Sequence, residues 1–155
     1  MTLPRTTLLR LEAQLDTLPL FTESLKAEAV ARRPPSNKWS IHEHTAHLGR
    51  YHEVFLKRLG RILDEDRPTL GRYRAEDDSG FDPWTKLSSE DVWEGLKARH
   101  AELLGFVDGL NADQLARAGV HPKLGEMDVP LWLEFFLLHE AHHLYRILWL
   151  SKTGE

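Results

Sequence analysis

Residues 128–151 read DVPLWLEFFLLHEAHHLYRILWLS, and this stretch decides the fold. Its apolar positions recur every three or four residues, which predicts an amphipathic helix. Because Pro130 is tolerated in a first helical turn, we expect the helix to begin near Asp128 and to end between Ser151 and Gly154. Two histidines share the predicted buried stripe with aromatic and aliphatic residues: Trp132, Phe135, Phe136, His139, His143, Ile147 and Leu150. Trp149 is also expected in the core.

Three further segments have helical periodicity, and no run of residues alternates as a strand would. A first helix is expected over roughly residues 6–30, with a kink or restart at Pro19. A second helix is expected from Ser40 to about Asp64, because Ser40 followed by Glu43 is a capping-box pattern. A third is expected from Ser88 to about Leu110.

Two loops connect these segments. Residues 65–86 are polar and rich in turn formers, which predicts a long loop between the second and third helices. Residues 119–126 are expected to form a second loop, before the last helix. The sequence therefore predicts an all-α protein, a four-helix bundle with a long loop between helices 2 and 3, in which residues 1–155 form a single domain.

The composition is typical of a soluble globular protein. The 155 residues are 41% hydrophobic and 28% charged, and the formal net charge is −4. No Lys/Arg-rich tract indicates a nucleic-acid partner, and no apolar run is long enough to cross a membrane. A cytoplasmic location is the expectation. There is no cysteine, so thiolate ligands and a cysteine nucleophile are excluded, and any thiol in a reaction must come with a substrate.

Nine histidines are present, and seven of them fall in two short windows. In the last helix His139 and His143 are four residues apart, so their Cβ atoms are expected about 5–6 Å from each other on one face. Two imidazoles at that spacing can reach one metal ion at roughly 2.1 Å. Two core histidines without a metal would both have to stay neutral and hydrogen-bonded, which favours a metal site.

A third ligand is expected from the second helix, which offers four histidines. We expect His42 to be solvated and His52 to lie at the surface or behind the ligands. His44 lies nearer the centre of the apolar stripe, whereas His47 lies to one side of it. Periodicity alone slightly favours His44 and leaves His47 open.

Three motifs resemble those of the DinB/YfiT-like metal-binding bundles. The segments are KWSIHEHTAHL at residues 38–48, HPKLG at residues 121–125 and HEAHHL at residues 139–144, in the family's order. The resemblance implies that one histidine of the second helix and two of the fourth bind a divalent ion. These are His47, His139 and His143. It also implies zinc or nickel as the first choice of metal, with iron or manganese as alternatives.

The sequence departs from the family at two positions, where Arg50 and Arg146 replace residues that are often acidic or amide side chains. If these arginines face the site, they favour an anionic substrate. Residues 139–143 also fit the zinc-protease pattern His-Glu-x-x-His, but no third ligand follows His143 at the required spacing. We therefore expect Glu140, about 100° around the helix from His139, to be at the surface or behind the ligands.

Three neutral imidazoles leave a metal ion with an open position, as in catalytic sites. The resemblance implies a metal-dependent enzyme, first of all a transferase that joins a low-molecular-weight thiol to a small electrophilic substrate. The alternatives are a metal-dependent hydrolase and a metal-binding, stress-related protein without turnover, for which a homodimer packed through exposed helix faces is conceivable. The sequence assigns no catalytic side chain.

Overall fold

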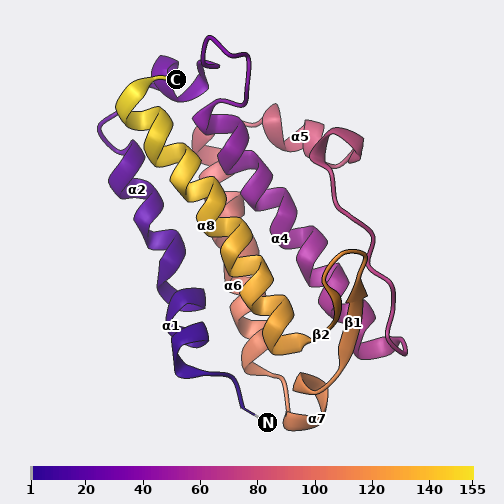
Figure 1. The fold of residues 1–155 in the computed structure, drawn as a ribbon. Coiled ribbons are helices and arrows are strands. Elements are labelled where there is room, and N and C mark those ends of the chain that lie inside the picture. Colours follow the sequence, from indigo (N-terminus) through magenta and orange to yellow (C-terminus); the bar gives the residue numbers. More distant parts are fainter. Residues whose placement is uncertain (1) are drawn as a thin grey trace.

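Three long helices and one broken helix form the bundle in the computed structural model, which describes residues 2–155 (Figure 1). The long helices are α4 (Ile41–Asp64), α6 (Ser89–Asp108) and α8 (Val129–Thr153). The broken helix consists of α1 (Arg5–Ala13), a 3₁₀ turn η1 (Gln14–Asp16) and α2 (Thr17–Thr22). Helix α4 packs against both α6 and α8, and α8 also packs against α1 and α2. The predicted four-helix bundle is confirmed.

The first helix breaks at Gln14–Asp16, one turn before Pro19. A proline ring clashes with the carbonyl four residues earlier and leaves it without a helical hydrogen bond, which here is the carbonyl of Leu15. Pro19 therefore causes the predicted break, but the break lies upstream of it. The helix expected over residues 6–30 also ends early, at Thr22, and residues 27–31 form a separate short helix, α3 (Ala27–Ala31).

The connection between α4 and α6 is long, as predicted, and contains two short helical elements. These are the 3₁₀ turn η2 (Ala75–Asp77) and the helix α5 (Phe81–Thr85). The ring of Trp84 in α5 lies directly over two glycines, Gly49 of α4 and Gly95 of α6. Because neither glycine has a Cβ, the indole fits against both helix backbones and anchors the connection to the bundle.

The expected loop at residues 119–126 contains a β-hairpin, so the prediction that the chain has no strand was wrong. Strands β1 (Ala118–His121) and β2 (Gly125–Asp128) pair antiparallel, after a short helix α7 (Ala112–Leu115). Each strand has four residues, too few for alternation to be visible in the sequence. Gly125 has a φ of 78°, which glycine adopts without strain.

The apolar core is divided into two clusters along α8. One cluster includes α8 residues up to Leu137, and the other begins at Leu144. The histidines of the last helix lie in the interval between them. Trp149 is 45% exposed, so the expectation that it lies in the core was wrong. Within residues 2–155, no helix has the length and apolar character needed to span a bilayer.

Candidate metal centre

The start of α4 is fixed by the predicted capping box, which the structure confirms. The amide of Glu43 donates to Ser40 Oγ at 3.2 Å, and the amide of Ser40 donates to Glu43 Oε2 at 2.9 Å. Arg33 pairs with the same Glu43 carboxylate. This cap sets the rotation of the first two turns of α4, and so determines which of its histidines face α8.

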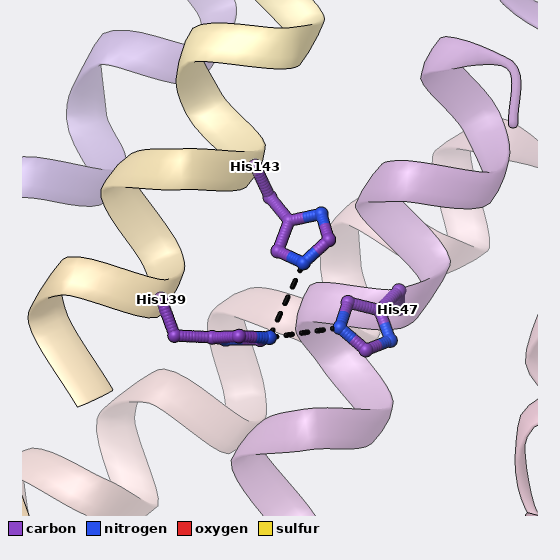
Figure 2. Close-up of side chains that lie close together, drawn as sticks. All are labelled: His47, His139 and His143. Carbon is purple, nitrogen blue, oxygen red and sulfur yellow. Dashed lines mark hydrogen bonds between the residues drawn. The ribbon is translucent and has the colours of Figure 1, made fainter. Parts of the chain in front are cut away.

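His47, His139 and His143 come together between α4 and α8 (Figure 2). His139 Nε2 lies 3.0 Å from His47 Nε2 and 3.2 Å from His143 Nε2. One nitrogen of an imidazole has either one proton or one lone pair in the ring plane, so His139 Nε2 can make only one of these two contacts as a hydrogen bond. The geometry therefore leaves one nitrogen pair that hydrogen bonding does not satisfy.

His44 lies behind this group and does not join it. Its Nδ1 lies 2.9 Å from Nδ1 of His143, on the side of the ring opposite to the three converging nitrogens. A hydrogen bond between these two Nδ1 atoms fixes the orientation of the His143 ring and directs Nε2 toward His139. Of the two histidines that the sequence left open, the structure thus brings His47 into the cluster and gives His44 a supporting position.

The four histidines are neutral near pH 7. Burial, followed by neighbouring Arg146 and His142, lowers the pKa of His44 to about 4, and burial followed by His44 lowers the pKa of His47 to about 4. Burial also lowers the pKa of His139 and of His143 well below the usual value. Neutral imidazoles have the lone pairs that metal coordination requires.

Aromatic rings surround the three histidines. The ring centroid of Trp39 lies 5.0 Å from that of His47, and the centroid of Phe81 lies 5.9 Å from His47. The ring centroids of Tyr51 and His139 are 3.9 Å apart. A pocket of 540 Å³ opens onto the group and is lined by these nine residues: Trp39, His47, Arg72, Tyr73, Arg74, Ala75, Glu76, His139 and His143.

Arg50 does not face this pocket as a free cation. Its Nε donates to Asp78 Oδ2 at 2.7 Å and its Nη1 donates to Glu53 Oε2 at 2.7 Å. The hydrogen bonds from Arg50 outweigh the effect of burial and lower the pKa of Asp78 to about 2. Tyr73 also donates to Asp78, at 2.9 Å. Arg50 therefore holds the α4–α6 connection in place, and it does not support the binding of an anionic substrate.

Arg146 lies beside the site. It lines a neighbouring pocket with Trp39 and His44, and that pocket also contains Lys38 and Glu76. Trp39 and Glu76 line both this pocket and the one that opens onto the three histidines. Of the two arginines that differ from the family motif, Arg146 is thus the one that lies near the candidate site without being paired to the α4–α6 connection.

A second polar cluster was not predicted. His52 is fully buried and Glu140 is 1% exposed, so of the two expected positions, at the surface or behind the ligands, the surface is excluded for both. Together with His100 of α6 they form a group whose nitrogen and oxygen atoms lie within 4.8 Å of one another. Burial raises the pKa of Glu140 to about 7. The only signal in the sequence was that Glu140 and His52 are both offset around their helices from the first cluster. The structure places both of them next to His100 of α6.

Comparisons with known proteins agree with the fold. The structure is similar to YfiT from Bacillus subtilis, described as a probable metal-dependent hydrolase with an unusual four-helix bundle topology, with a TM-score of 0.77 and 18% identity over 99% of this chain and 90% of that one. It is also similar to TT2238, a four-helix bundle protein, with a TM-score of 0.65 and 23% identity over 92% and 94% of the two chains. No curated protein matches the sequence. Residues 10–147 match the DinB superfamily, and the chain therefore belongs to that superfamily.

Proposed function

We propose that His47, His139 and His143 bind one divalent metal ion and that the chain is a metal-dependent enzyme acting on small molecules. The observation that carries the proposal is the convergence of three Nε2 atoms at 3.0 and 3.2 Å at the base of a pocket. Ligand nitrogens at about 2.1 Å from an ion are about 3.0 Å apart in octahedral geometry and about 3.4 Å apart in tetrahedral geometry. The observed separations fall within that range.

The donor set fits zinc or nickel, with iron or manganese as alternatives, because neutral imidazole is a ligand of intermediate softness. A bound ion would supply Lewis acidity, which lowers the pKa of a thiol or water molecule that it binds. The chain itself supplies the other requirements. His44 orients His143, the rings of Trp39 and Phe81 exclude water from one side, and the pocket admits a small substrate.

Within this function, we favour a transferase that joins a low-molecular-weight thiol to an electrophile. The chain has no cysteine, so a thiol would enter as cosubstrate through the pocket. Hydrolysis is the second candidate, and it is supported by the description of YfiT and by Glu76, a carboxylate at the pocket that could accept a proton. A metal-binding protein without turnover is the third.

Elemental analysis of the purified variants tests the metal site. We expect His47→Ala, His139→Ala and His143→Ala each to lose one metal equivalent relative to the wild type. His142→Ala is the matched control, since this histidine is exposed on the same helix and outside the three converging nitrogens, and it should keep the full metal content. Wild-type metal content in all three ligand variants would refute the site.

Activity assays separate the three functions. Metal-loaded protein is incubated with a panel of cellular thiols and a chloro-aromatic electrophile, and separately with ester and amide substrates. Thioether product that disappears in His143→Ala supports the transferase, and hydrolysis that disappears in the same variant supports the hydrolase. Absence of product from every thiol would refute the transferase, and absence of turnover in both assays would favour the non-catalytic alternative.

A further inference from the structure

The second polar cluster joins three helices of the bundle. His52 lies on α4, His100 on α6 and Glu140 on α8. His52 Nε2 lies 3.3 Å from His100 Nδ1 and 3.6 Å from Glu140 Oε2. None of these three residues lines the pocket that opens onto the first histidine group.

Hydrogen bonds within the protein satisfy this cluster only in part. His52 Nδ1 donates to the carbonyl of Leu48 at 2.7 Å, and the lone pair on its Nε2 can accept a hydrogen bond from His100 Nδ1 at 3.3 Å. The other ring nitrogen of His100, Nε2, has no hydrogen-bond partner among the described residues. Gln14 Nε2 donates to Glu140 Oε1 at 3.0 Å, but Glu140 Oε2 has no hydrogen-bond partner among the described residues. The separation of 3.6 Å between Glu140 Oε2 and His52 Nε2 is too long for a hydrogen bond, whichever atom has the proton.

The carboxylate also lacks a counter-charge. Among residues 2–155, the only basic side chain within 4.0 Å of Glu140 is His52. His52 directs its Nδ1 to the carbonyl of Leu48 and its Nε2 lies 3.6 Å from Glu140 Oε2, so it makes no hydrogen bond to the carboxylate. An uncompensated carboxylate inside an apolar core is costly unless it is neutralised or bound to a cation.

We propose that His52, His100 and Glu140 bind a second divalent transition-metal ion, enclosed within the bundle. Two imidazoles and one carboxylate form a donor set that zinc and similar ions prefer. Ligand atoms around a tetrahedral zinc ion are about 3.3–3.4 Å apart, close to the separations of 3.3 and 3.6 Å found here. The hydrogen bond from His52 Nδ1 to a carbonyl is the second contact that metal-binding histidines usually make.

This second ion would be structural, because its ligands hold α4, α6 and α8 together and lie away from the pocket. Gln14 adds the broken first helix to the group through its hydrogen bonds to Glu140 and to the carbonyl of Leu137. His52 and Glu140 are buried and His100 is half-buried, so we expect the ion to leave slowly. The ion in the first site is next to a pocket and should exchange faster.

Metal content distinguishes the two sites. The protein is loaded with Co²⁺ or Zn²⁺, freed of excess metal by gel filtration, and analysed by mass spectrometry for metal per chain. We expect two equivalents in the wild type and in the control His142→Ala, and one equivalent in Glu140→Gln and in His100→Gln. His47→Ala should keep one equivalent, and the double variant His47→Ala/Glu140→Gln should keep none.

Release kinetics give an independent readout. With a colorimetric chelator, the wild type should release one equivalent quickly and one at least tenfold more slowly, and Glu140→Gln should lack the slow phase. Circular dichroism verifies that each variant is folded; if Glu140→Gln does not fold, His100→Gln decides. Wild-type metal content in folded Glu140→Gln and in folded His100→Gln would overturn the proposal. Loss of one equivalent in Glu140→Gln but not in His47→Ala would refute the first site and leave the second standing.

Discussion

Substitution of Gly49 by alanine tests how the connection between α4 and α6 is fixed beside the candidate metal centre. A Cβ at this position would lie 2.7 Å or less from three ring carbons of Trp84. Carbon atoms in ordinary contact are about 3.5–4.0 Å apart, so the indole would have to move by more than about 1 Å. The same edge of the ring, Cζ3 and Cη2, also lies against α6, where a Cβ on Gly95 would be 3.0 Å from it, so the ring has little freedom to move along either helix.

The magnitude follows from two opposing contributions. Overpacking of a filled site usually destabilises by about 1–3 kcal/mol. Replacing glycine by alanine in a helix acts in the other direction, by about 0.5–1 kcal/mol. Gly60 lies on the same helix, and no atom lies within 4 Å of the position that a Cβ would take there, so Gly60→Ala isolates the second contribution. We expect Gly49→Ala to be about 1–3 kcal/mol less stable than Gly60→Ala, which itself should be about 0.5–1 kcal/mol more stable than the wild type. Relative to the wild type, Gly49→Ala should then lower the free energy of unfolding by about 0–2.5 kcal/mol.

Urea unfolding followed by far-UV circular dichroism measures both variants, and a double-mutant cycle with Trp84→Ala assigns the cause. In the Trp84→Ala background, Gly49→Ala should no longer destabilise, because the ring that it meets is gone. Equal stability of Gly49→Ala and Gly60→Ala would refute the reasoning, and so would a penalty that persists without the indole. Because α5 also places Phe81 near His47, we expect Gly49→Ala to weaken metal binding as well.

Three further predictions concern charge and protons at the site. The depressed pKa of Asp78 contributes about 2 kcal/mol to the free energy of unfolding above pH 4, and this contribution is lost as the pH falls toward 2. In Asp78→Asn, the free energy of unfolding should therefore depend less on pH between 4 and 2, as measured by acid unfolding followed by circular dichroism. Because burial holds the pKa of His47 near 4, metal binding at pH 7 should release close to zero protons from the three histidines. Calorimetry in buffers of different ionisation enthalpy measures the number of protons released, and release of two or more would contradict neutral ligands. His44→Ala should weaken metal affinity about 10–100-fold in a competition titration and leave the stoichiometry unchanged, and an unchanged affinity would argue against its orienting role.

The fold was predictable because its signals are long and repeated. The last helix extends over 25 residues, and the predicted start near Asp128 agrees with the observed cap, in which Asp128 accepts a hydrogen bond from the amide of Leu131 at 3.0 Å. The capping box at Ser40 is equally local, since it depends on two residues three positions apart. The hairpin was not predictable in the same way. Its two four-residue strands are stabilised by each other and by backbone hydrogen bonds between Val120 and the α4–α6 connection.

The candidate site was predictable where it depends on spacing within one helix. His139 and His143 follow from their four-residue separation, and the structure places their Nε2 atoms 3.2 Å apart. The choice between His44 and His47 depends on how α4 is rotated against α8, and periodicity cannot determine that rotation to within one residue. Here both histidines contact α8: His47 Nε2 lies 3.0 Å from His139 Nε2, whereas His44 Nδ1 lies 2.9 Å from His143 Nδ1. The family motif, rather than the helical pattern, indicated His47.

The second cluster could not be predicted from sequence spacing, because its three members lie on three different helices and no other histidine is close to His100 in the sequence. His47 and His52 are five residues apart, which turns them by about 140° around α4, and His139 and Glu140 are turned by about 100° around α8. The same two helices therefore present polar groups on two different sides, and both groups fall in the interval between the two apolar clusters. A polar layer of this kind weakens a bundle unless a ligand compensates it. Metal binding at either group would stabilise the folded chain by an amount that grows with metal concentration, about 2.7 kcal/mol at a hundredfold excess over Kd. The two proposed sites would thus link the stability of the bundle to its metal content, and we expect the link to be strongest at Glu140, whose Oε2 has no hydrogen-bond partner among the described residues.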